Sequence, residues 1–277
     1  GTLIFLPGLA ALSQAQGWKP AVLVIAAAAA VLVPLVLWLL PERPEDAGTQ
    51  AYGADPLTPH TPPPSHGRPV KMAFDALFMA ARTPSFWLLF ATFFVCGFTT
   101  NGLVGTHMIS LCADHGLIEV QAASLMALMG LFDLVGTTAS GWLTDRVDSR
   151  KLLFVYYGLR GLSLIYLPFS DFSLVSLSFF AVFYGLDWIA TVPPTLRLAN
   201  QAFGEDKAPI VFGWIAAGHQ IGAASAAFLA GVLRTTEGRY LEAFIFAGLT
   251  GLVAAGLSLA IGRGARATPA LAAAPAR

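Results

Sequence analysis

The stretch Gly141-Trp142-Leu143-Thr144-Asp145-Arg146-Val147-Asp148-Ser149-Arg150-Lys151 is a short turn in which five of the eleven side chains are charged. It separates two apolar runs, residues 120–143 and 152–169. The runs are 24 and 18 residues long, close to the roughly 20 residues that a helix needs to cross a bilayer. Because the hydrocarbon core offers the backbone no hydrogen-bond partners, a crossing segment must be helical unless it belongs to a closed barrel. The turn and its flanks therefore predict an all-α membrane protein.

Apolar runs separated by more polar segments continue along the whole chain. The 277 residues are 56% hydrophobic and 12% charged, whereas soluble domains are about a quarter charged. The 16 basic and 16 acidic residues cancel, which disfavours nucleic-acid binding, and two cysteines exclude a disulfide-rich scaffold. The first run is too short to span, so we expect an N-terminally truncated helix. The eight apolar runs are residues 3–15, 21–40, 86–111, 120–143, 152–169, 174–199, 210–233 and 241–261.

The segment between the second and third runs divides the chain. Residues 41–84 hold a proline-rich stretch that predicts a flexible linker, and then a short amphipathic segment at the membrane interface. Residues 1–40 precede it with two runs, and residues 85–262 follow with six, before a tail at 263–277. Twelve basic residues fall on the linker side of the membrane and three on the opposite side. This bias predicts a cytoplasmic linker and C-terminus in an inner or plasma membrane.

The charged turn resembles the G-x-L-x-D-R-x-G-R-K/R signature of the major facilitator superfamily, in which it acts as a gate latch. Asp148 stands where the signature has glycine. The resemblance implies a bundle of twelve helices in two halves, of which this chain would hold helices five to twelve. We expect glycine in the turn to allow close helix approach and its acid to accept hydrogen bonds at a neighbouring helix. The matching positions are Gly141, Leu143, Asp145, Arg146, Arg150 and Lys151.

A narrower resemblance is to the monocarboxylate porter and oxalate–formate antiporter group. It is carried by Phe5-Leu6-Pro7 with Gly17-Trp18-Lys19, and by Asp133, which matches an aspartate of that group's eighth helix. The arginine that the group carries one turn later is replaced by Thr137. The resemblance implies a secondary active transporter of a small organic anion, coupled to protons.

Four ionisable residues lie within the apolar runs: Asp133, Arg160, Asp187 and His219. Ionisable groups at this depth are costly, so each is a candidate for function. At 1.5 Å per residue they lie about 12–18 Å from the cytoplasmic end, which predicts one layer near the midplane. A partly desolvated carboxylate can carry a proton, so Asp133 or Asp187 is the expected coupling site, with His219 as another. We expect Arg160 to pair with Asp133, either to fix helix register or to bind substrate.

Less costly polar residues complete the set of candidates. Asn101 could bond substrate or another helix. Tyr184 and Thr191 share a helical face with Asp187. Pro193-Pro194 should break or kink its helix, which predicts a hinge.

Other functions remain open at this point. A drug or metabolite efflux transporter is the main alternative, and a non-transporting receptor or structural protein is another. An intramembrane aspartyl protease is disfavoured because Asp187 lacks the G-x-G-D setting. No nucleotide-binding loop or zinc-helix motif occurs, so no enzyme activity, cofactor or metal is expected. The expected partners are a small-molecule substrate, protons and the bilayer, with a monomeric protein and no nucleic acid.

Overall fold

The computed structural model describes residues 2–41, 44–49 and 69–262, and within them the regular structure is entirely helical. Seven segments are long and apolar enough to cross a membrane, so the prediction of an all-α membrane protein is confirmed. The proline-rich part of the predicted linker lies largely outside the described residues. The seven segments are Trp18–Leu39 (α2), Pro84–Asp114, Glu119–Thr144 (α6), Ser149–Phe169, Leu174–Phe203, Ala208–Glu237 (α10) and Leu241–Ser258 (α11).

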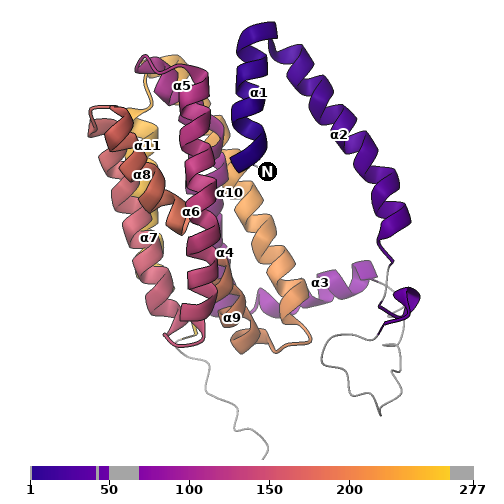
Figure 1. The fold of residues 1–277 in the computed structure, drawn as a ribbon. Helices are drawn as coiled ribbons and strands as arrows, with labels where there is room; N and C mark the ends of the chain where they lie inside the picture. The colour runs from indigo at the N-terminus through magenta and orange to yellow at the C-terminus, as the bar shows by residue number, and fades with distance from the viewer. Residues whose placement is uncertain (1, 42–43, 50–68, 263–277) are drawn as a thin grey trace, which may run out of the picture.

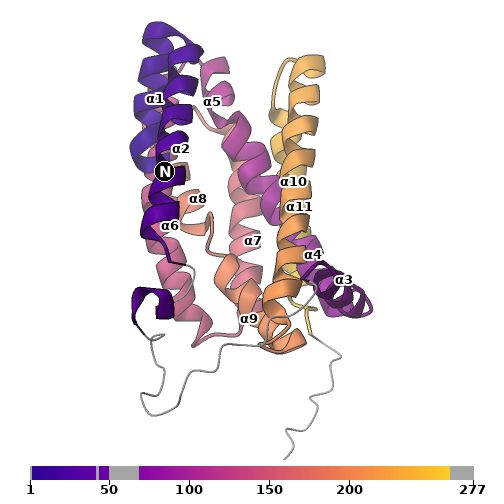
Figure 2. The ribbon, with the colours of Figure 1, turned by 90° about the vertical axis from the view of Figure 1, so that its right-hand side faces the viewer.

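The helices form a bundle from which one helix, α2, stands away (Figure 1). Helix α1 (Thr2–Gln16) is 15 residues long and packs on α6, whereas α2 packs against α1 and stands away from the bundle. Helix α3 (Pro69–Ala80) lies across one end of the bundle, where the Trp214 indole nitrogen donates to the Ala73 carbonyl at 2.9 Å (Figures 1 and 2). The turns between α6 and α7 and between α9 and α10 lie at this same end. A short 3-10 turn, η1, covers Pro44–Ala47.

Three of the spans are not continuous α-helices. The first contains α4 (Pro84–Gly97), a π-helical segment η2 (Phe98–Val104) and α5 (Gly105–Asp114). In the second, Ser149–Phe169, helix α7 (Ser149–Tyr166) ends in a 3-10 turn, η3 (Leu167–Phe169). The third consists of α8 (Leu174–Asp187) and α9 (Val192–Phe203), with a four-residue turn between them.

The helix breaks between α8 and α9, just before Pro193 and Pro194, the residues from which a break was predicted. Pro193 and Pro194 occupy the first turn of α9, where an amide hydrogen would have no partner within the helix. The unwound residues are therefore 188–191, one turn earlier than the prolines themselves. This places the break directly after Asp187.

Glycines let particular helix pairs touch through their backbones. A Cβ at Gly222 on α10 would collide with the Phe94 carbonyl on α4, and one at Gly136 on α6 would collide with the Leu186 carbonyl on α8. Gly141 differs, because no atom lies within 4 Å of the position that its Cβ would take. The expectation that Gly141 permits close helix approach is therefore wrong.

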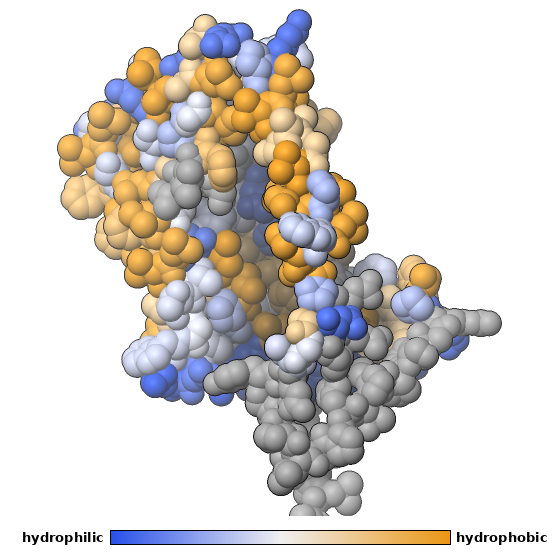
Figure 3. Space-filling view, turned by 45° about the vertical axis from the view of Figure 1, so that its right-hand side comes forward, coloured by the Kyte–Doolittle hydropathy of each residue, from blue (hydrophilic) through white to orange (hydrophobic). Residues whose placement is uncertain are grey.

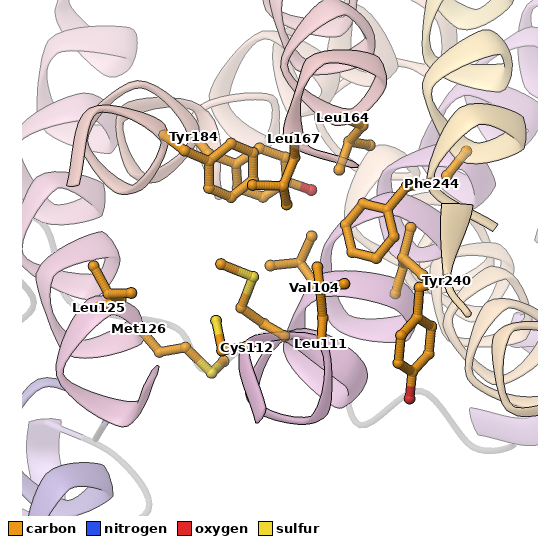
Figure 4. Close-up of a cluster of buried hydrophobic side chains, with 14 of the residues drawn as sticks. Val104, Leu111, Cys112, Leu125, Met126, Leu164, Leu167, Tyr184, Tyr240 and Phe244 are labelled. Carbon is orange, nitrogen blue, oxygen red and sulfur yellow. The ribbon is translucent and has the colours of Figure 1, made fainter. Parts of the chain in front are cut away.

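The interior and the exterior of the bundle are both apolar. One buried cluster joins η2, α5, α6, α8 and α11, and Figure 4 shows its side chains converging from these helices. A second buried cluster lies towards α3 and α9. Many large side chains also face outward, for example Phe228, which is 71% exposed. On the face in Figure 3, hydrophobic residues cover the middle and hydrophilic ones gather at the ends, as expected for a surface in contact with lipid.

Candidate functional site

The break between α8 and α9 is held by one arginine from α7. The Arg160 side chain is 1% exposed, and its Nε donates to Asp187 Oδ2 at 2.6 Å. Its Nη2 donates to the Asp187 carbonyl at 2.5 Å and reaches the Trp188 carbonyl at 3.3 Å. A helix end leaves carbonyls without intrahelical partners, and at this depth there is little water to replace them. Arg160 therefore binds both the charge and the free carbonyls at the end of α8.

This ion pair differs from the expected one. We expected Arg160 to pair with Asp133, but its carboxylate partner is Asp187. The continuous polar face of Tyr184, Asp187 and Thr191 is also interrupted, because α8 ends at Asp187. Both differences have the same origin, since the unwound turn after Asp187 brings its carboxylate and carbonyl to the α7 side together.

Other buried polar groups surround the pair. Arg160 Nη1 lies 3.1 Å from Cys96 Sγ on α4, and Cys96 Sγ lies 3.3 Å from Thr191 Oγ1. The Tyr184 hydroxyl donates to the Thr99 carbonyl at 2.8 Å, which ties α8 to the π-helical segment. Arg160, Asp187 and Thr191 are thus brought together through Cys96, a residue that the sequence did not single out.

Two oxygens at this site have no hydrogen-bond partner among the described residues. They are Asp187 Oδ1 and the hydroxyl of Tyr157, a fully buried side chain whose ring lies 5.5 Å from the Arg160 guanidinium carbon. Buried polar groups are rarely left unpaired, and exceptions concentrate where water, a proton or a ligand binds. Tyr157 lies three residues before Arg160 on one helix face, and this spacing was the signal in the sequence that could have identified it.

Asp133 binds the same break from the opposite side. On α6 it is partly buried, and its Oδ1 accepts from Thr137 Oγ1 and from the Ile189 amide, both at 3.0 Å. Thr137 is the residue that replaces the arginine of the resembling group. The unwound turn is therefore held by an arginine on its carbonyl side and by an acid on its amide side.

The remaining candidates lie at different distances from this centre. His219 on α10 is partly buried, near the Cys96 thiol, with its ring centroid 5.1 Å from that of Phe93. Its backbone packs directly against Gly97. Asn101 is exposed on η2, and its carbonyl accepts a hydrogen bond from Thr106 Oγ1 at 2.9 Å. The structure thus gathers the four ionisable candidates around the α8–α9 break and leaves Asn101 outside.

No metal site accompanies these groups in the described ranges 2–41, 44–49 and 69–262. No group of three or more histidine, cysteine or acidic side chains there could hold a metal ion.

The charged turn between α6 and α7 is linked to the middle of α9. Arg197 Nη1 donates to Asp145 Oδ1 at 3.1 Å and also bonds the Thr144 carbonyl. Asp148 accepts from the Arg150 amide at 2.9 Å and has φ −59°, so it caps the N-terminus of α7 without needing glycine's conformational freedom. The substituted position therefore retains a well-formed turn.

Comparison with known proteins agrees with this architecture. The family model described as Major Facilitator Superfamily matches residues 1–227 and 122–275. Monocarboxylate transporter 13 of Rattus norvegicus is 30% identical over 157 residues, which cover 56% of this chain and 36% of that protein. The uncharacterized MFS-type transporter YcxA of Bacillus subtilis is 24% identical over 273 residues, 91% of this chain and 60% of its own length. The gallate transporter of Pseudomonas putida is 25% identical over 167 residues, 54% and 36% respectively.

The chain thus spans between 28% and 60% of the length of the curated relatives that it matches. The resemblance to the monocarboxylate group is confirmed at low identity. The family model covers almost the whole chain, and the helix content and the charged turn agree with it. On these grounds, the chain is a multi-pass membrane protein that belongs to the major facilitator superfamily.

Proposed function

We propose that the protein is part of a secondary active transporter that works by alternating access and moves a small organic anion together with protons. The observation that carries the proposal is the buried Arg160–Asp187 pair at a helix break in the middle of a membrane-spanning bundle. Broken helices at membrane depth are tolerated where they are buried in protein or line a cavity, and transporters use them as binding sites. The names of relatives, monocarboxylate transporter and gallate transporter, favour a carboxylate as the substrate class.

The pair suggests how a proton and an anion would be coupled. Asp187 has one carboxylate oxygen on Arg160, while its other oxygen, Oδ1, has no hydrogen-bond partner among the described residues. Protonation of that oxygen would neutralise Asp187 and leave the Arg160 cation without its counter-ion. A substrate carboxylate could then pair with Arg160, because two planar N–H donors match a carboxylate well. In this mechanism proton and anion enter together, and the site remains neutral overall.

Asp133 and His219 have supporting roles in the proposal. Asp133 holds the Ile189 amide, so its protonation would loosen the same unwound turn. His219 is an alternative proton carrier beside Cys96. The gate-latch role is assigned to the turn around Asp145, which we place on the cytoplasmic side together with α3 and the C-terminus.

The test is transport by the full-length protein in proteoliposomes. We expect a labelled monocarboxylate to accumulate when the outside is acidified and not when the pH is equal on both sides. Asp187→Asn should abolish the accumulation but retain exchange of labelled for unlabelled substrate, because exchange needs no net proton movement. Asp206→Asn, the same change at an exposed position between α9 and α10, is the matched control and should behave as wild type.

Two results would count against the proposal. Equal accumulation by Asp187→Asn and wild type would mean that the buried acid does not couple protons. Transport of apolar drugs but of no carboxylate would favour the efflux alternative, and absence of any transport would favour the receptor alternative.

A further inference from the structure

A second polar pocket lies at the α6–α7 end of the bundle, away from the helix break. It has a volume of about 270 Å³ and is lined by three arginines and two aspartates, together with Val147, Ser149 and Gln201. The three arginines are Arg146, Arg150 and Arg197. The pocket also contains the N-terminus of α7, an 18-residue helix. Helix N-termini attract anions because their amide hydrogens lack partners and the helix dipole is positive there.

Two donors in the pocket have no acceptor in the described part of the chain. Ser149 is 4% exposed, and its hydroxyl has no hydrogen-bond partner. The Nε of Arg150 also lacks one, and the closest carboxylate contact, Asp148 Oδ1, is 3.8 Å away. Unpaired buried donors next to excess positive charge indicate a place for an acceptor with several oxygens.

The two acids of the pocket are already engaged. Asp145 pairs with Arg197 at 3.1 Å, and Asp148 caps the amide of Arg150 at 2.9 Å. The three arginines and two aspartates leave one net positive charge in the lining, and among the described residues Arg146 is the arginine of the pocket that has no carboxylate partner. We propose that this pocket binds a phosphate group, with the Ser149 hydroxyl and the Arg150 guanidinium donating to phosphate oxygens and Arg146 supplying charge.

The pocket lies where a lipid headgroup or a dissolved phosphate compound could both reach it. Trp142 is 57% exposed on the outside of α6, and the Arg146 guanidinium stacks on its ring at 4.1 Å. Tryptophans and arginines of this kind sit at the level of the headgroups in membrane proteins. A phosphate carried by a lipid would therefore be at the correct height.

The experiment measures ligand affinity of the full-length protein in detergent, by thermal shift and native mass spectrometry. The probes are inorganic phosphate, with chloride at equal ionic strength, and short-chain phosphatidic acid, with the diacylglycerol that lacks only the phosphate. We expect stabilisation by the phosphate-bearing member of at least one pair. Binding of phosphatidic acid alone identifies a lipid headgroup, and binding of both identifies a site that also accepts free phosphate.

Three variants make the test specific. Arg150→Gln should weaken binding about tenfold, and Ser149→Ala about fivefold, because hydrogen bonds to a charged acceptor are strong. Ser149→Ala removes a hydroxyl without a partner, so the fold should be unaffected. Lys151→Gln is the matched control, because Lys151 is the exposed cation next to Arg150 and does not line the pocket. The proposal is overturned if no phosphate-bearing probe binds, if Ser149→Ala binds as wild type, or if Lys151→Gln loses as much affinity as Arg150→Gln.

Discussion

The buried pair at the helix break gives the sharpest stability prediction. We consider three variants: Asp187→Asn, Arg160→Met and the double variant. Asp187→Asn keeps the shape of the side chain but leaves the Arg160 cation, which is 1% exposed, without a counter-charge. Arg160→Met removes the cation and also leaves the carbonyls of Asp187 and Trp188 without their donor.

The expected magnitudes follow from these contacts. Removal of one partner from a buried ion pair costs about 3–5 kcal/mol of unfolding free energy. Arg160→Met should cost more than Asp187→Asn, because each orphaned carbonyl adds about 1–3 kcal/mol. The double variant leaves the carbonyls unpaired but has no buried net charge. It should therefore be no less stable than Arg160→Met alone, which corresponds to a coupling of at least about 3 kcal/mol between the two positions.

The size of the coupling discriminates between two interpretations. Neutral hydrogen bonds between membrane helices are worth about 0.6–2 kcal/mol, so a coupling above about 2 kcal/mol requires a charge pair. The assay is unfolding of the full-length protein in mixed micelles at neutral pH, followed by circular dichroism. Asp206→Asn, at an exposed position, supplies the baseline.

Either of two results would refute the reasoning. Additive effects of the two single variants would mean that the contact contributes no pairwise energy. An Asp187→Asn protein within about 1 kcal/mol of wild type would mean that the carboxyl group is already neutral in the folded protein.

Three further predictions concern packing and capping. Gly136→Ala should destabilise the bundle by about 1–3 kcal/mol, because the added Cβ would strike the Leu186 carbonyl. Gly141→Ala should be neutral, because open space surrounds that position. Equal melting temperatures for the two variants would contradict this packing. Tyr184→Phe should cost about 1 kcal/mol by removing the hydroxyl that bonds the carbonyl in η2, with no loss if that bond is absent in solution. Asp148→Ala should lower the unfolding free energy by about 1 kcal/mol, because it removes the side chain that caps α7. The stability of each of these variants is measured by thermal melting.

The hydropathy pattern was sufficient to predict the spans but not the contacts between them. Apolar length and turn charge predict a membrane helix locally, and the segments Glu119–Thr144 and Ala208–Glu237 match the predicted runs closely. The partner of Arg160 could not be predicted, because Asp133 and Asp187 lie at similar depth. Which of them meets the arginine depends on helix rotation and on the unwinding after Asp187. That unwinding is a tertiary feature stabilised by Arg160 and Asp133 themselves.

The sequence alone did not predict the π-helical segment η2. Residues Phe98–Val104 contain two threonines, an asparagine and a glycine, a composition that is also compatible with an ordinary α-helix. Within the segment, Gly102 lies directly against the Ala223 backbone of α10. Local propensity contains no information about a neighbour more than one hundred residues away.

The contacts also separate rigid from deformable parts of the bundle. The α4–α10 and α7–α11 pairs touch backbone to backbone at glycines such as Gly222 and Gly161, where any larger side chain would force the helices apart. The turn at residues 188–191 is different, because side-chain bonds from Arg160 and Asp133 hold it, and its Ile189 is exposed. A change in the charge of Asp187 or Asp133 acts directly on those bonds. Under the proposed coupling, protonation of Asp187 or Asp133 would therefore act first on the α8–α9 break, and not on the glycine contacts of the α4–α10 and α7–α11 pairs.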